Sequence, residues 1–275
     1  MNTKPLAVTG SAYSTTAFSL VVPGGSVRPV SAASTESNQP PVVTAPAHTL
    51  PVGQNGPDTI PVVLSWSATD EDGIAGYELQ QSTDGGATFT NMPLPTCITT
   101  TLTLSITPNG AGQHWDFAVR ATDRLGAVSD YKAGPAFKVE TYQESASAVV
   151  YAGAWKADSV SGAYGDSVTY ASTAAAKATF TFTGSSVSWV STRGTDRGKA
   201  EVWLDGTKKA TINLYASSRN VRQTVYAING LSTNTSHNLE IRVVGEKDPS
   251  SSSTRIDIDG FIALRFINDP TGLPF

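Results

Sequence analysis

Cysteine is almost absent from this sequence, since Cys97 is the only one among 275 residues. A single cysteine excludes an intrachain disulfide and a metal site built from several thiolates. The chain is long enough for two domains of about 100 residues, and each of them can bury a core that folds without cross-links. The scarcity of cysteine therefore leaves the cellular compartment open.

An excess of positive charge is also lacking. The formal net charge is −4, and only 15% of the residues are charged. Residues 1–140 carry six Lys and Arg against eleven Asp and Glu, and residues 141–275 carry thirteen against twelve. Neither half has the basic excess that nucleic-acid binding needs, so we expect no nucleic-acid partner.

Long apolar runs and helical periodicity are missing as well. No segment reaches the roughly 20 apolar residues of a membrane span, and the start of the chain lacks the apolar core of a secretory signal peptide. Good helix formers never gather at a period of 3.6 residues. The nucleophile elbow, the zinc-protease helix and the P-loop are absent, so we expect a protein that is not an enzyme.

What the sequence does contain is Ser, Thr, Gly, Ala and Val in short alternating runs that end at turn residues. This composition suits strands and tight turns, and it predicts an all-β fold. We expect two tandem β-sandwiches after an N-terminal arm. The predicted divisions are an arm and linker at 1–40, a first sandwich at 41–142, a second sandwich at 148–268 and a tail at 269–275.

The first predicted sandwich has strands at 62–68, 76–82, 100–106, 114–123 and 135–140, with turn signals between them. The segments "LSWSATDEDGIAGYELQQSTDGG" and "FAVRATDRLGAVSD" resemble bacterial fibronectin type III or immunoglobulin-like modules, with Trp66 as the core tryptophan. Trp115 departs from that pattern, because such modules more often carry tyrosine there. The resemblance implies a module for spacing and display, without chemistry of its own.

The second predicted sandwich contains "YAGAW", "FTGSSVSWV", "DRGKAEVWLDG" and "RIDIDGFIAL". Together these segments resemble the galactose-binding-like β-sandwiches that are appended to bacterial carbohydrate-active enzymes. The resemblance covers the whole C-terminal half and implies a carbohydrate-binding jelly-roll module. This kind of fold hosts many different ligands, so the fold alone does not name one.

The charged loop "STRGTDRGKA" and the strand that follows it are the candidate sugar site. If Ala200, Val202 and Leu204 face the core, alternation turns Trp203 outward between two carboxylates. A flat ring can stack on a pyranose while polar groups bind its hydroxyls. The candidate ligand-binding residues are Trp203, Glu201, Asp205, Arg193, Asp196, Arg197 and Lys199.

Simpler explanations compete with the sugar site. The loop can be locked by an ion pair of Asp196 with Arg193 or Arg197, and Trp203 can be covered by other parts of the structure. A phosphate cradle is the weakest alternative, because this loop leads into a strand and such cradles lead into a helix.

Two acidic clusters raise the question of structural calcium, and we expect no other cofactor. Asp70 and Asp72 lie in one predicted loop and Asp123 in another, and the immunoglobulin-like resemblance places both loops at the same end of the sandwich. Asp257 and Asp259 resemble positions that hold calcium in some sugar-binding modules. Turn formation explains the same residues without a metal.

The arm carries a third candidate site, because Phe18, Leu20 and Val22 alternate before a "PGG" turn. Such a segment is marginal alone and stable when it pairs with a neighbouring sheet. We therefore predict assembly through the arm, with further copies of this chain or with other virion or surface proteins. In that hypothesis self-association depends on residues 1–40.

Two functions remain open on the sequence alone. The first is a non-catalytic display protein of a surface assembly, such as a phage virion decoration or minor tail protein, which can also bind a cell-surface polysaccharide. The second is a secreted or cell-surface carbohydrate-binding accessory protein. The missing signal peptide and the arm favour the first, and both place the protein on a virion surface or outside the cell.

Overall fold

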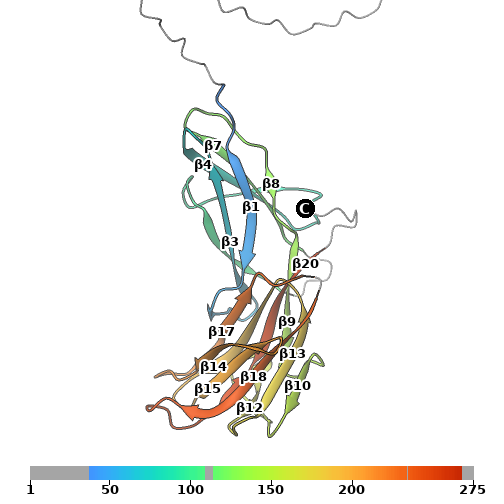
Figure 1. The fold of residues 1–275 in the computed structure, drawn as a ribbon, viewed down its shortest axis with the longest axis vertical. Coiled ribbons are helices and arrows are strands. Elements are labelled where there is room, and N and C mark those ends of the chain that lie inside the picture. The colour runs from blue at the N-terminus through green and yellow to red at the C-terminus, as the bar shows by residue number, and fades with distance from the viewer. Residues whose placement is uncertain (1–36, 109–113, 234, 268–275) are drawn as a thin grey trace, which may run out of the picture. The chain divides into compact units, whose positions relative to one another are not determined.

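The structure is a computed structural model that describes residues 37–108, 114–233 and 235–267. The arm residues Phe18, Leu20 and Val22 lie outside this described part. From Asn38 onward the described residues form one compact unit of antiparallel β-sheets, whose only helical element is the 3₁₀ turn Tyr164–Asp166 (Figure 1). The predicted all-β sandwich fold is confirmed.

No helix in the described part of the chain has the length and apolar character that a membrane crossing requires.

The first sandwich consists of two antiparallel sheets. One sheet has the order β1-β3-β6, with strands Val42–Thr49, Ile60–Thr69 and Thr101–Ile106. The other has the order β5-β4-β7-β8, with strands Thr90–Met92, Ile74–Ser82, Asp116–Asp123 and Lys132–Ala133.

Alternation of side chains explains why β3 forms a strand with one buried face. Val62, Leu64 and Trp66 are at most 5% exposed. Trp66 lies edge-on to Tyr77, with ring centroids 6.4 Å apart. The predicted core position of Trp66 is therefore confirmed.

Strand β1 was not predicted from the sequence. It pairs only with β3 and lies at the edge of its sheet, and its register shifts between Thr44 and Ala47 around Pro46. Proline lacks the N–H that a central strand needs, so it is tolerated at edges and bulges. Pro46 interrupts the alternating pattern, so the strand is evident only from its pairing with β3.

The second sandwich contains two five-stranded sheets. The inner sheet has the order β2-β17-β14-β20-β9, with strands Gly53–Gln54, Asn220–Asn229, Ser186–Arg193, Gly260–Phe266 and Phe137–Gln143. The outer sheet has the order β10-β13-β18-β15-β16, with strands Val149–Ala152, Lys177–Thr183, Ser236–Lys247, Gly198–Leu204 and Thr207–Asn213. A small sheet completes the set, in the order β11-β12-β19, with strands Lys156–Ser159, Ser167–Ala171 and Ile256–Ile258.

The inner sheet is buried on both faces. Trp189 and Phe261 pack in the core between the inner and outer sheets, and both are at most 1% exposed. Their neighbours Val190 and Ile262 point to the other face and pack with the core of the first sandwich. The predicted core position of Trp189 is confirmed.

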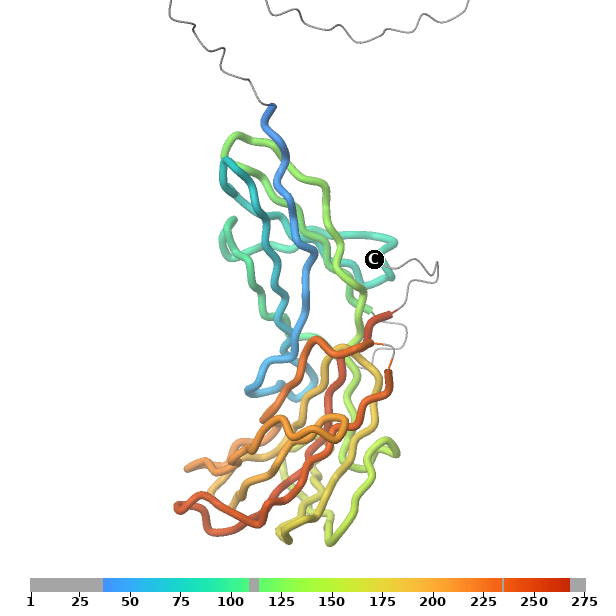
Figure 2. Tube along the Cα trace, in the orientation of Figure 1, coloured from blue at the N-terminus to red at the C-terminus, as the bar shows by residue number. Residues whose placement is uncertain are grey.

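Strand β9 joins the two sandwiches. Phe137 and Val139 belong to the core of the first sandwich, while the backbone of β9 pairs with β20 of the inner sheet along its whole length (Figure 2). The two cores therefore lie against the two faces of one sheet that includes β9, which a division of the chain by sequence pattern cannot show.

Candidate functional site

The outer sheet turns one face to the core and the other to solvent. On β15, Ala200, Val202 and Leu204 are buried, so Glu201 and Trp203 point outward and are partly exposed, as the alternation predicts. The register places Trp203 opposite Glu240 of β18, and Glu240 opposite Thr179 of β13. We call the outward-facing set on four neighbouring strands the Trp203 face: Lys177, Thr179, Glu201, Trp203, Lys208, Glu240 and Arg242.

Polar contacts hold the Trp203 ring in place. Its Nε1 donates a hydrogen bond to Glu201 at 2.9 Å, and Lys208 donates to the same carboxylate at 2.6 Å. The guanidinium of Arg242 lies over the indole, 3.9 Å from the ring centroid. A cation over an aromatic ring is attracted to its π-electrons, so Arg242 already covers one face of the indole.

The two carboxylates of the Trp203 face are held in their ionised form. Hydrogen bonds from Lys208 and then Trp203 lower the pKa of Glu201. Burial raises the pKa of Glu240, but hydrogen bonds from Arg242 at 2.5 Å and Lys177 at 3.3 Å outweigh it, so this pKa lies below its ordinary value.

Sequence reasoning missed the four other charged members of the face, which are Lys177, Lys208, Glu240 and Arg242. The alternation in "HNLEIRVVG" is the signal that turns Glu240 and Arg242 outward. Their position beside Trp203 depends on the pairing of β15 with β18, which the sequence does not show.

Asp205 lies at the end of the Trp203 strand, in a tight turn. Asp205 and Gly206 have φ of 49° and 77°, as a two-residue hairpin turn requires, so the predicted Asp-Gly turn is present. The carboxylate of Asp205 accepts the backbone N–H of Asn238 at 2.8 Å and lies 2.7 Å from Nδ1 of His237. The carboxylate oxygens of Asp205 therefore stabilise the turn.

Ion pairs and hydrogen bonds to other residues of the chain hold the charged loop in place. Asp196 forms an ion pair with Arg197, which is one of the two pairings that the sequence left open. Arg197 is only 4% exposed, and its second ion pair, with Asp257, measures 2.5 Å. Arg193 donates to the carbonyl of Asn213 at 2.9 Å, while Lys199 reaches Glu246 at 3.5 Å. Because Arg197 is buried, its side chain is not accessible to a sugar.

Two arginines form ion pairs with Asp257 and compensate its negative charge. Arg197 and Arg255 bind its two oxygens at 2.5 and 2.6 Å, and Arg255 also pairs with Asp158 and lies over the ring of Tyr170. Burial raises the pKa of Asp257, while the two guanidinium groups lower it. With both oxygens engaged by cationic side chains, this carboxylate offers no free ligand for calcium.

Asp259 is fully buried, and no lysine or arginine side chain in the described part of the chain forms an ion pair with it. Its Oδ1 accepts the backbone N–H of Tyr164 at 2.9 Å, and its Oδ2 has no hydrogen-bond partner in the structure. Burial, together with the negative charge of Glu144, raises the pKa of Asp259 to about 7. A neutral carboxyl group fits this setting better than a metal ligand.

The structure brings Asp70, Asp72 and Asp123 together. One oxygen of each lies within 4.8 Å of the others, and no other trio of His, Cys, Asp or Glu side chains in the described part of the chain meets so closely. The first two residues lie in the loop between β3 and β4, and Asp123 ends β7. Burial raises the pKa of Asp123, but hydrogen bonds from Ala127, Asn38 and Leu125 outweigh it, so this pKa lies below its ordinary value.

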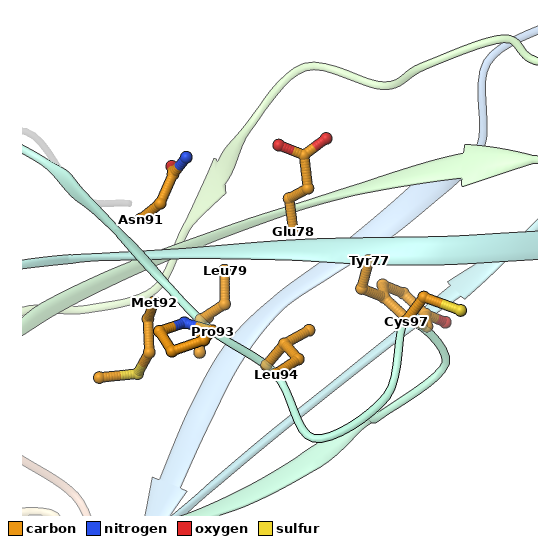
Figure 3. A pocket seen from close by; sticks show the side chains of 8 residues that line it. All are labelled: Tyr77, Glu78, Leu79, Asn91, Met92, Pro93, Leu94 and Cys97. Carbon is orange, nitrogen blue, oxygen red and sulfur yellow. The ribbon is translucent and has the colours of Figure 1, made fainter.

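A pocket of about 550 Å³ opens on the first sandwich, beside β4 and β5. Leu79, Met92 and Leu94 point to one side of β4, while Glu78 and Asn91 point to the other (Figure 3). The hydroxyl of Tyr77 already accepts the N–H of Ala68 at 3.0 Å. The pocket therefore lacks the cluster of free polar groups that would recognise a sugar.

Comparison with known proteins gives partial matches. No model of a known protein family matches the chain. The A type blood N-acetyl-alpha-D-galactosamine deacetylase of Flavonifractor plautii is 30% identical over 83 residues. These residues are 30% of this chain and 11% of the deacetylase, so the chain spans a small part of that relative.

Two solved structures align with most of this chain at low identity. A Paenibacillus xanthan lyase aligns with a TM-score of 0.38 and 11% identity, over 84% of this chain and 23% of the lyase. An α-L-rhamnosidase from Aspergillus terreus aligns with a TM-score of 0.30 and 10% identity, over 85% of this chain and 28% of the rhamnosidase.

Proposed function

We propose that this chain is a non-catalytic carbohydrate-binding protein that holds a saccharide against the Trp203 face. The observation that carries the proposal is a partly exposed tryptophan on a sheet face that is otherwise polar and charged. In this proposal the first sandwich is of the fibronectin type III or immunoglobulin-like kind, and it serves as a spacer. The second sandwich is of the galactose-binding-like kind.

The chemistry of the face suits a sugar. The indole offers an apolar surface for the C–H groups of a pyranose, and Glu201, Glu240 and Arg242 offer acceptors and donors for its hydroxyls. Arg242 covers one face of the indole, so a saccharide stacks on the other face or displaces the guanidinium. Binding that rests on one ring and a few hydrogen bonds supplies about 4–6 kcal/mol, which corresponds to a Kd between roughly 1 mM and 50 μM.

The state of the carboxylates supports a non-catalytic role. A glycosidase needs one carboxylic acid with a raised pKa and a second carboxylate across the scissile bond. Glu201 and Glu240 both have a lowered pKa and are held by lysine or arginine. Neither is suited to donate a proton to a leaving group.

The relative that matches part of this chain also supports a carbohydrate-related role. By its name the Flavonifractor plautii deacetylase acts on a blood-group sugar, and only 11% of it matches this chain. In our proposal the shared segment is an accessory part of such a glycan-acting protein. The phage virion role has no support among the described residues, because it rests on Phe18, Leu20 and Val22, and it stays a prediction.

The test is a titration of the full chain with a panel of soluble polysaccharides, followed by calorimetry or tryptophan fluorescence. We expect Trp203→Ala to weaken binding at least tenfold. Trp155→Ala is the matched control, because Trp155 is a partly buried tryptophan of the same sandwich whose Nε1 bonds to the carbonyl of Ala152. If both variants bind as the parent does, or if no polysaccharide binds the parent, the proposal is wrong.

A further inference from the structure

We propose that Asp70, Asp72 and Asp123 of the first sandwich bind a calcium ion. The ion would tie the β3–β4 loop to the end of β7, where the register already places Ile74 opposite Asp123. This inference does not rest on sugar binding, because the Trp203 face belongs to the second sandwich.

The spacing of the three carboxylates fits calcium. Calcium binds oxygen at about 2.3–2.6 Å, so two ligands on opposite sides of one ion are roughly 5 Å apart at most. One oxygen from each of the three residues lies within 4.8 Å of the others. A single ion can therefore touch all three without a large movement of the loops.

A buried and unpaired oxygen points independently to a ligand. Asp123 is only 1% exposed, and its Oδ1 accepts the backbone N–H groups of Leu125 and Ala127 at 2.8 and 2.9 Å. Its Oδ2 is buried and has no hydrogen-bond partner in the structure. An ionised oxygen without a partner is costly in the interior, and a cation between the two loops would satisfy it.

Among the described residues the cluster has no direct ion-pair partner. In the described part of the chain, none of the three carboxylates has a lysine or arginine nitrogen within 4.0 Å, although the guanidinium of Arg124 lies beside Gly73. The side chain of Asn38 hydrogen-bonds to Asp123, and its own Oδ1 is buried without a partner.

Turn formation explains Asp70 and one oxygen of Asp123, but it does not explain Asp72. Oδ1 of Asp70 accepts the N–H of Asp72 at 2.9 Å, which shapes the loop. The carboxylate of Asp72 accepts no hydrogen bond from any described residue, and turn formation leaves Oδ2 of Asp123 unpaired. Asp72 is therefore the residue whose presence the metal accounts for best, and the one that can be changed with the least damage to the fold.

The experiment measures the thermal midpoint of the full chain after treatment with a chelator, and then with added CaCl2 or MgCl2. Calcium in about hundredfold excess over its Kd is expected to raise the midpoint by roughly 5–10 °C. Asp72→Asn should remove that shift. Without calcium this variant should be at least as stable as the parent, because it removes one of three neighbouring like charges.

Glu71→Gln is the matched control, since Glu71 is an exposed acid of the same loop that is not part of the trio. It should keep the full calcium shift. The proposal is overturned if calcium does not move the midpoint of the parent, or if Asp72→Asn responds to calcium as the parent does. An equal shift with magnesium would overturn the assignment to calcium.

Discussion

Asp259 offers the sharpest test of the buried electrostatics. The carboxyl group is fully buried between β19 and β20, and the structure raises its pKa from 3.8 to about 7. Burial is the largest cause, and the negative charge of Glu144 adds to it. A group that binds its proton more tightly in the folded state makes the protein less stable as the pH rises through the interval between its two pKa values.

The magnitude follows from the two pKa values. At about pH 5 the folded protein keeps the proton and the unfolded chain has lost it, which adds about 2.7 kcal/mol to the free energy of unfolding. At about pH 8 both states are ionised and the contribution is ~0.1 kcal/mol. The structure therefore predicts a loss of about 2.6 kcal/mol between these pH values that is due to this one group.

The measurement compares the parent with Asp259→Asn in urea unfolding at both pH values. Asparagine has nearly the same shape, keeps an oxygen for the N–H of Tyr164 and does not titrate. The variant should gain about 2.6 kcal/mol on the parent when the pH is raised from about 5 to about 8. Contributions from other groups cancel in this difference. If the gap between the two proteins is the same at both pH values, Asp259 is not a buried group with a raised pKa.

Two further predictions concern other buried ionisable groups. Burial lowers the pKa of His48 from 6.5 to about 4 beside Phe137, so the stability present above pH 6.5 should fall by about 3 kcal/mol on acidification to about pH 4. His48→Gln should flatten that fall in urea titrations, and an unchanged slope would contradict the assignment. Arg197→Met should cost about 3–5 kcal/mol, because it leaves Asp257 buried with one partner fewer. Exposed Arg219→Met should cost about 0.5 kcal/mol or less, and equal losses in the two variants would show that the buried pair does not stabilise the fold.

Local patterns predicted many of the elements of the fold. Alternating apolar residues predicted most of the strands, and they correctly placed Trp66 and Trp189 in the cores. The Asp205-Gly206 turn followed from the same local rules, because a two-residue hairpin needs positive φ. These features depend on neighbours in sequence, so a single chain is sufficient to see them.

The candidate sites were visible only in part. The outward position of Trp203 follows from the period of a strand, but its contact with Arg242 depends on which strand pairs with β15. The meeting of Asp70, Asp72 and Asp123 was expected from the resemblance to immunoglobulin-like modules, and the structure shows it. The buried, unpaired Oδ2 of Asp123 had no signal in the sequence.

The sequence by itself determined most of the strands, the Asp205-Gly206 turn and the face to which the residues of those strands point, because side chains alternate with a period of two. Only the tertiary structure decided that Arg197 is a buried partner of Asp257, 60 residues away, and that β9 contributes to two cores. Long-range pairing brings such groups together, and their burial then determines their charge. The fold therefore decides whether an arginine contacts a sugar, solvent or a buried carboxylate. The residue type alone does not.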